Sequence, residues 1–188
     1  MQPLMTERST ENTDDASCIA ASLAAPHAFG TLYDRHAATV FRYVCSRLGP
    51  DADDVVGDTF VIAFRIRSKF DASRGRSALP WLLGIATKAI AKRRDAELRW
   101  IRRPAPDGPA ADRTDEVESR VDGALLSPWL RASLEQLRRG DREALLLHVV
   151  GDLSVEDVGQ ALGIPPGTVK SRLHRARTIL AAQLEIHR

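Results

Sequence analysis

Apolar residues recur at helical spacing along three segments in the first half of the chain. Residues 29–48 place Phe, Leu, Val and Ala side chains on one face, and a glycine-proline pair follows, which favours the end of a helix. Residues 51–70 repeat the pattern. A third helix is predicted to begin at Leu79-Pro80, because proline in a first turn loses no hydrogen bond that the helix needs. The first half therefore predicts packed helices.

The second half of the chain predicts two further helices, over 129–137 and 141–150, followed by a third and a fourth that share a tight turn. Ser154, with Asp157 three residues later, forms a start like a capping box. Gly163 ends that short helix, and Pro166 opens the next one. Two helices joined by a short glycine-containing turn are typical of a helix-turn-helix.

The second helix of this pair has two distinct faces. One face is apolar and is predicted to be buried. Its members are Val169, Leu173, Ala176 and Leu180. The opposite face carries Gly167, Ser171, His174, Arg175 and Thr178, with Lys170, Arg172 and Arg177 toward the flanks. Short and basic side chains of this kind suit a helix that enters the major groove of DNA. The alternative is an amphipathic helix whose charged face is only solvated.

The hydrophobic pattern divides the chain into two small helical domains. Residues 1–26 are expected to form a disordered tail, 27–103 the first domain and 128–188 the second. The stretch 104–127 is predicted to be a flexible linker, because proline and glycine interrupt it and its acidic residues outnumber its basic ones six to two. We therefore expect an all-α protein.

Composition narrows the function classes without choosing one. Aromatic residues make up only 5% of the chain and the net charge is +2, so the distribution of charge matters more than its sum. Cys18 and Cys45 are far apart and have no metal or redox spacing, so no cofactor is expected. No signal peptide and no membrane-spanning run is recognised, which predicts a cytoplasmic protein without membrane insertion.

Several stretches, in this order, resemble the extracytoplasmic-function (ECF) group of bacterial sigma factors, which belong to the sigma-70 family. They are "FGTLYDRHAATVFRYVCSRLG", "DADDVVGDTFVIAFRIRSKFD" and "WLLGIATKAIAKRRD" for region 2, and "LLLHVVGDLSVEDVGQALGIPPGTVKSRLHRAR" for region 4. The resemblance implies a transcription initiation factor that binds core RNA polymerase and directs it to promoters with −35 and −10 elements. It implies no catalytic chemistry.

The resemblance also assigns the polymerase contact to the helix that contains "DADDVVGDTF". The matching residues, expected to dock on the β′ clamp coiled coil, are Asp53, Asp54, Asp58 and Phe60. Residues 50–64 hold four carboxylates and no basic side chain, which suits a basic partner surface. The alternative is that these carboxylates only favour the positive end of the helix dipole.

The third helix and the loop before it carry the opposite charge. Between Ile85 and Arg103 there are seven basic residues and two acidic ones, a pattern that favours phosphate binding. The resemblance assigns recognition and opening of the −10 element to this region. The candidate residues are Arg74, Arg76, Trp81, Lys88, Lys92, Arg93 and Arg94. Many relatives have asparagine where this chain has Lys88, so this lysine either changes the base preference or contacts phosphate. Trp81 is either a stacking platform or a core residue.

For the −35 element the resemblance implicates the second helix of the helix-turn-helix. The candidates are Gly167, Thr168, Lys170, Ser171, Arg172, His174 and Arg175. The stretch 129–150 is expected to seat this domain on the β flap, and an anti-sigma factor is a possible further partner. Gly159 stands where alanine is common in the family and is expected to weaken its helix modestly.

Two other function classes stay open at this point. A stand-alone transcription regulator also ends in a helix-turn-helix, but that class leaves the acidic helix of the first domain unexplained. A hydrolase would use the Asp cluster or His148 and His174, yet the chain shows no nucleophile–base spacing, phosphate loop or metal triad.

Overall fold

The computed structural model describes residues 14–49, 52–101 and 128–186, and these are helical with no strand among them. The α-helices are α1 (Asp15–Ala24), α2 (Gly30–Leu48), α3 (Ala52–Arg65), α4 (Leu79–Ile101), α5 (Pro128–Glu135), α6 (Arg139–Val149), α7 (Val155–Leu162) and α8 (Pro166–Ile186). Short 3-10 turns lie at Pro26–Phe29, Arg67–Lys69 and Ala72–Arg74. The all-α prediction is confirmed, and the predicted linker lies outside the described residues.

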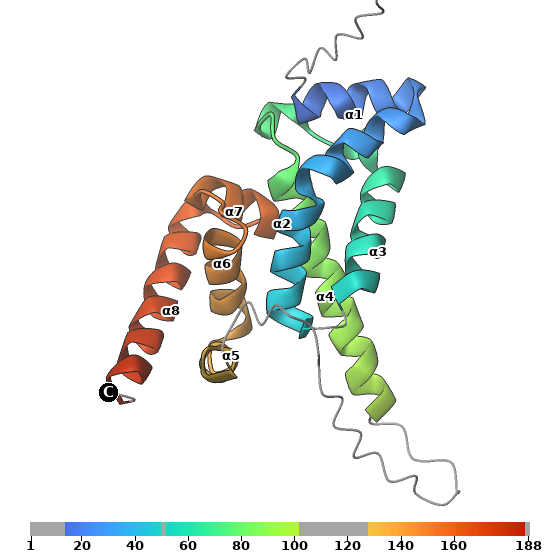
Figure 1. The fold of residues 1–188 in the computed structure, drawn as a ribbon. Coiled ribbons are helices and arrows are strands. Elements are labelled where there is room, and N and C mark those ends of the chain that lie inside the picture. Colours follow the sequence, from blue (N-terminus) through green and yellow to red (C-terminus); the bar gives the residue numbers. More distant parts are fainter. Residues whose placement is uncertain (1–13, 50–51, 102–127, 187–188) are drawn as a thin grey trace, which may run out of the picture.

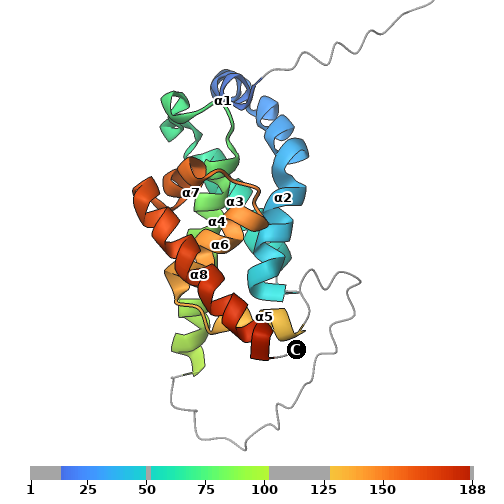
Figure 2. The same cartoon turned by 90° about the vertical axis from the view of Figure 1, so that its left-hand side faces the viewer.

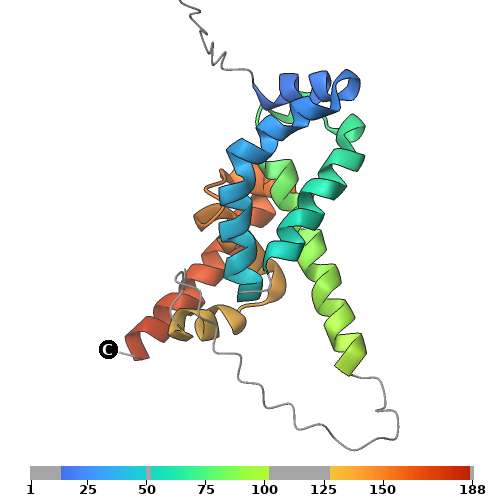
Figure 3. The same cartoon turned by 45° about the vertical axis from the view of Figure 1, so that its right-hand side comes forward.

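Two bundles make up the fold, as Figure 1 shows: α1 to α4 form one and α5 to α8 the other. In the first, α1 crosses one end of the α2–α3–α4 bundle, while the C-terminal half of α4 extends beyond α3 (Figure 3). In the second, α8 lies along α6, as the view in Figure 2 makes clear. The long helices bury the stripes expected from the sequence, including Val40 on α2, Leu82 on α4 and Val169 on α8.

The first helix corrects the prediction of a disordered tail up to residue 26. Asp14 caps α1 by accepting a hydrogen bond from the Ser17 amide at 2.8 Å, and Cys18 and Ile19 are buried. The residues of α1 are mostly small, so its sequence offers few large apolar side chains to mark a buried stripe. Residues 1–13 of the predicted tail lie outside the described part of the chain.

A buried carboxylate joins α1 to the rest of the first bundle. Asp15 accepts hydrogen bonds from Arg35 at 3.0 Å and from the Ala78 amide at 2.7 Å, and it lies 2.6 Å from His36 Nε2. Burial by itself raises the pKa of Asp15, but the hydrogen bonds to His36, Ala78 and Arg35 outweigh it and hold the pKa at about 2. One side chain therefore ties together α1, α2 and the start of α4.

Candidate nucleic-acid interface

The turn between α7 and α8 has the geometry that the sequence predicts. Ser154 caps α7 by accepting a hydrogen bond from the Asp157 amide at 3.0 Å. Gly163 ends α7 with a φ of +67°, a conformation that glycine adopts without strain. Pro166 is the first residue of α8. These local signals set the turn through which the N-terminal half of α8 packs Val169 against α7.

Gly159 has a packing role that the sequence did not reveal. A Cβ at this position would lie 2.8 Å from the carbonyl oxygen of Ile164, which is backbone and cannot swing away. That turn is closed by a hydrogen bond from the Ile164 amide to the Gly159 carbonyl at 3.0 Å. The expectation that Gly159 only weakens its helix is therefore incomplete, because a larger residue would push the turn apart.

The predicted DNA-facing side of α8 is exposed along its first half. Val169, Leu173 and Ala176 are buried against the bundle, as predicted. The exposed residues on the other side are Gly167, Lys170, Ser171, His174, Arg175, Arg177 and Thr178. Thr168 is half-buried at the edge of this face. Arg177 was placed only on a flank by the sequence, yet it continues the line of Lys170 and His174 at helical spacing.

Two of the predicted −35 residues form hydrogen bonds to α6, although the Arg175 side chain is still 48% exposed. Arg175 donates hydrogen bonds from Nη2 and Nε to the two carboxylate oxygens of Asp141 at 2.7 and 3.2 Å, and the Asp141 side chain is only 4% exposed. This hydrogen bonding raises the pKa of Arg175. Arg172 donates to the carbonyl of Gly140 at 3.4 Å. Both arginines thus fasten α8 to the start of α6 and set the direction of the exposed face.

Three of the predicted −10 residues line a cavity of about 400 Å³ at the N-terminal half of α4. Trp81 and Lys88 line it together with Arg74. The Trp81 ring meets the Phe70 ring edge to face, with centroids 5.4 Å apart, so Trp81 both packs and presents a surface. Gln160 and Ala161 of α7 form part of the wall. The second domain therefore covers one side of this cavity.

The other predicted −10 residues are spread over different faces. Lys92 is exposed one turn after Lys88 on the same side of α4. Arg93 is exposed and donates to Glu97 at 2.8 Å, and Arg76 is 87% exposed near Asp14. Arg94 points away from this cavity toward the second domain. Its Nη2 donates to the Arg47 carbonyl at 2.6 Å.

The acidic face of α3 is exposed at three of the four predicted polymerase-contact positions, Asp53, Asp54 and Asp58. Phe60 is the exception: it is 6% exposed and meets Tyr33 edge to face with centroids 4.8 Å apart. The expectation of a direct contact through Phe60 is therefore wrong in this fold, because the ring belongs to the core. Sequence reasoning missed Val61 and Ile62, which are 49% and 38% exposed one turn after Asp58. Their spacing from Asp58 is the signal that could have found them.

The two domains also meet directly at a close contact between α4 and α7. A Cβ on Gly84 of α4 would lie 2.7 Å from the carbonyl oxygen of Ala161 on α7. A Cβ on Gly151, just after α6, would meet Leu83 of α4 at 2.8 Å. The approach of Gly84 to the Ala161 backbone needs glycine, whereas the Leu83 side chain beside Gly151 could shift, so the closed arrangement of the domains depends mainly on Gly84.

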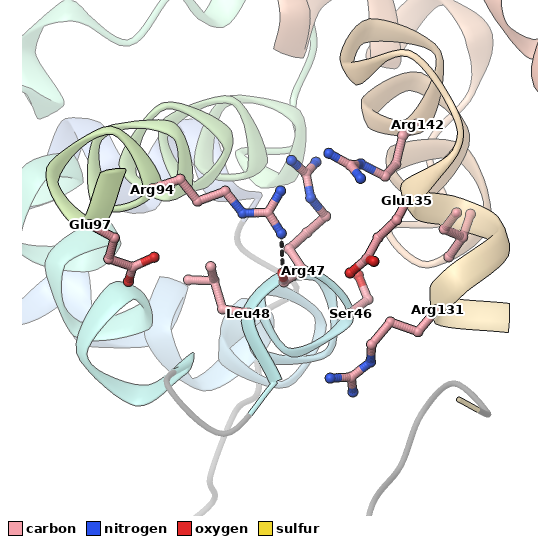
Figure 4. A pocket seen from close by; sticks show the side chains of 9 residues that line it. Ser46, Arg47, Leu48, Arg94, Glu97, Arg131, Glu135 and Arg142 are labelled. Atoms are coloured by element: carbon pink, nitrogen blue, oxygen red, sulfur yellow. Dashed lines mark hydrogen bonds between the residues drawn. The ribbon is translucent and has the colours of Figure 1, made fainter. Parts of the chain in front are cut away.

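A second cavity, of about 260 Å³, lies further along the domain interface. We call it the arginine cavity, because Arg47, Arg94, Arg131 and Arg142 line it (Figure 4). Burial lowers the pKa of the Arg94 and Arg142 guanidiniums, and the charge of Arg47 lowers both further. Glu97 and Glu135 are the carboxylates in its lining.

Within the described ranges, no group of three His, Cys, Asp or Glu side chains is placed to hold a metal ion. None of the helices described is long and apolar enough to cross a membrane. Cys18 is buried and Cys45 is half-buried.

Family comparisons match both domains. Residues 32–102 match the Sigma-70 region 2 model and residues 128–180 match the Sigma-70, region 4 model. The two matches cover more than half of the chain, in the order that the sequence predicts. The chain therefore belongs to the sigma-70 family of RNA polymerase sigma factors, and within it to the ECF group. It is an alternative sigma factor that binds core RNA polymerase and promoter DNA and directs transcription initiation.

Individual relatives are of the same group. The chain is 33% identical over 174 residues to the ECF RNA polymerase sigma factor SigM of Mycobacterium tuberculosis, which covers 90% of this chain and 84% of SigM. It is 31% identical to the ECF RNA polymerase sigma factor BldN of Streptomyces coelicolor, covering 84% of this chain and 60% of BldN. The solved structure of CnrH in complex with the cytosolic domain of CnrY superimposes with a TM-score of 0.64 at 27% identity, over 92% of this chain and 97% of that one. A stand-alone regulator is not favoured by these findings.

Proposed function

We propose that the exposed face of α8 reads the −35 element, with Lys170, Ser171 and His174 as its DNA-contacting centre. The observation that carries this proposal is that some polar side chains of α8 bond to α6, whereas others lie on the outer face without such a bond. The guanidinium groups of Arg172 and Arg175 form hydrogen bonds to α6. Lys170, Ser171 and His174 are exposed on the face opposite the core, and among the described residues no hydrogen bond joins their side chains to α6. Gly167 lies in the first turn of α8, where the positive end of the helix dipole favours a phosphate, whereas the Thr168 amide donates to the Pro165 carbonyl at 2.9 Å. Arg172 and Arg175 position this face and add positive charge beside it.

The first domain takes the −10 element along α4. Trp81, Lys88 and Lys92 lie on one side of α4, and Arg74 faces the same cavity. This arrangement supports capture of an unstacked base between an aromatic ring and basic side chains. Lysine at position 88 donates hydrogen bonds but accepts none, which suits phosphate or a base acceptor. Arg93 and Arg76 supply charge at the edges, whereas Arg94 belongs to the domain interface.

The acidic face of α3 docks on the β′ clamp coiled coil. Asp53, Asp54 and Asp58 supply the charge, and Val61 and Ile62 add exposed apolar surface beside them. Carboxylates around an apolar patch are a combination that gives both steering and burial at a protein interface. The segment 129–150 seats the second domain on the β flap. The protein has no catalytic step of its own and acts in the cytoplasm, where its polymerase partner acts.

Promoter binding requires the two domains to separate. The −35 and −10 elements lie about 25 base pairs apart, which is roughly 85 Å along B-DNA. In the closed arrangement Gln160 and Ala161 of the second domain line the same cavity as Trp81 and Lys88, so the two domains are packed too closely to reach both elements at once. The 26 residues from 102 to 127 reach at most about 90 Å when extended, which is enough to join the separated domains. CnrH, a structural relative, is held by the cytosolic domain of CnrY. A comparable anti-sigma partner would act on this chain by favouring closure.

The proposal is tested by transcription from mapped genomic fragments with purified core polymerase. Lys170→Ala is expected to weaken promoter binding by about five- to tenfold and to reduce its salt dependence by about one phosphate contact, with unfolding unchanged. Arg175→Ala is the matched comparison. It should lower the stability of the second domain, because the buried Asp141 loses its partner. If Lys170→Ala leaves promoter binding intact, the assignment of this face is wrong.

Polymerase binding is tested separately. Asp54→Ala combined with Asp58→Ala should abolish core-dependent transcription and weaken binding to core at least tenfold, because both exposed carboxylates are lost from the proposed contact. Asp34→Ala removes an exposed carboxylate from α2 and serves as the control. Equal core affinity for the double variant and the wild type would refute the role of α3.

A further inference from the structure

The arginine cavity holds more positive charge than nearby carboxylates neutralise. Four arginines and two glutamates line it, and Glu97 is already bonded to Arg93 at 2.8 Å. Glu143, the carboxylate nearest to Arg47, lies 3.8 Å from it and accepts its closer hydrogen bond from Arg139 at 2.9 Å. Like charges gathered in a partly buried site repel one another, so the arginine cavity has an excess of positive charge that a bound anion would neutralise.

Hydrogen-bond donors aimed at this site also lack partners. The Arg47 side chain is only 3% exposed, yet its Nε and Nη1 find no acceptor within the described part of the chain. Nε of Arg142 is in the same position. Buried polar groups in folded proteins are nearly always satisfied, and each unmet charged donor is costly. Such donors call for an acceptor that the described residues do not supply.

The geometry indicates what kind of acceptor fits. In Figure 4 the guanidinium groups of Arg47, Arg94 and Arg142 converge from three different helices, while Arg131 and Glu135 lie to one side. Planar guanidiniums bind the oxygens of phosphate and carboxylate groups in pairs. Donors that approach from three directions match the several oxygens of a tetrahedral oxyanion better than the two oxygens of a carboxylate. The cavity volume of about 260 Å³ is at the lower end of small-molecule sites.

We propose that the arginine cavity binds a small oxyanion of the phosphate class, orthophosphate or pyrophosphate, which bridges the two domains. Arg47 and Arg94 contribute from the first domain and Arg142 from the second, so the complete site exists only when the domains are closed. An anion that binds only the closed form shifts the population toward it. By linkage, core polymerase, which needs the open form under the proposed function, and the anion weaken each other's binding.

Calorimetric titration of the full chain with orthophosphate and, separately, pyrophosphate in a chloride buffer tests the proposal. Wild-type protein is expected to bind one anion per chain. Arg142→Gln should weaken that binding about tenfold or more, through loss of a charge-assisted contact. Arg65→Gln, which removes an exposed arginine from α3, should bind like the wild type. Pyrophosphate binding without orthophosphate binding would identify the longer anion as the occupant. If neither anion binds, or if Arg142→Gln binds as tightly as the wild type, the site is refuted.

A second variant tests whether the anion bridges the two domains or is bound by one domain alone. It changes no residue that lines the arginine cavity. Gly84→Ala places a methyl group against Ala161 and should disturb the closed arrangement, so anion binding should fall. Gly30→Ala adds the same methyl group where no atom lies within 4 Å and should bind normally. Undiminished binding by Gly84→Ala would overturn the bridging role. All these titrations use the sigma factor alone, so their failure would leave the promoter assignments standing.

Discussion

The two domains meet in two places that differ in kind. At the α4–α7 contact the backbones approach so closely that Gly84 has no room for a Cβ beside Ala161. At the arginine cavity, on the same interface, buried guanidiniums crowd together with donors unmet. The first contact is held by shape and the second is opposed by charge. Because close packing favours contact between the domains and charge repulsion opposes it, we expect the two domains to separate readily. This suits a protein whose domains must separate to reach two promoter elements.

The strongest way to break the shape-based contact is Gly84→Ala. The new methyl group would lie 2.7 Å from the Ala161 carbonyl, so α7 must move and the domain contact should lose about 1–3 kcal/mol. Small-angle scattering should then report a larger radius of gyration. Gly30→Ala is the control, and an unchanged radius for Gly84→Ala would contradict the closed arrangement in solution.

Glu143→Gln should weaken the charged part of the interface. Glu143 is 8% exposed, accepts a hydrogen bond from Arg139 and faces Arg47 across the domain boundary. Removing its charge leaves Arg47 without its nearest anion, at an expected cost of about 1–2 kcal/mol. Denaturant unfolding measures the loss. Glu156→Gln, an exposed carboxylate on α7, should cost much less, and equal losses for the two variants would argue against a special role for Glu143.

A reference point away from the domain interface is the Asp15 junction. Its folded pKa of about 2 lies below the ordinary 3.8, so its contribution to stability is fully present above about pH 3.8 and is lost as the pH falls toward 2. We expect about 1–2 kcal/mol at neutral pH, after allowance for partial solvent screening. Asp15→Asn should remove it.

Thermal unfolding of wild type and Asp15→Asn between pH 6 and pH 2.5 measures this effect. The stability gap between them should narrow as the pH falls. A gap that stays constant with pH would mean that Asp15 acts by packing and not through its charge.

The smallest expected effect is relief of the arginine crowding. In chloride buffer without phosphate, Arg142→Gln should leave stability unchanged or raise it by up to about 1 kcal/mol, because a like-charge contact is removed. Raising the salt concentration should narrow the difference, since screening weakens the repulsion. A clear loss of stability at low salt would mean that Arg142 is held by partners other than an anion. The salt series with Arg142→Gln measures the contribution of charge at the arginine cavity, and Gly84→Ala measures the contribution of close packing at the α4–α7 contact.

Much of the candidate site was predictable because its signals are local. The serine cap at Ser154, the glycine at position 163 and the stripe through Val169 and Leu173 specify a helix-turn-helix from neighbouring residues alone. The acidic first turn of α3 was also predictable, because its aspartates are close together in the sequence. Phe60 was assigned to the polymerase contact by the family resemblance, although helical spacing groups it with Val55, Val56 and Ala63 on the apolar face of α3 that the structure buries. The helix α1 was missed because its buried stripe is built mostly from small residues.

The sequence by itself determined the two helical domains, their order and the charge of each surface, since these follow from periodicity, caps and composition over short stretches. Only the tertiary structure decided that Arg175 is bound to Asp141, that Gly84 touches α7, and that Arg47, Arg94 and Arg142 converge. The physical reason is distance along the chain. Contacts between residues so far apart in sequence depend on how whole helices pack, and no local pattern records that packing.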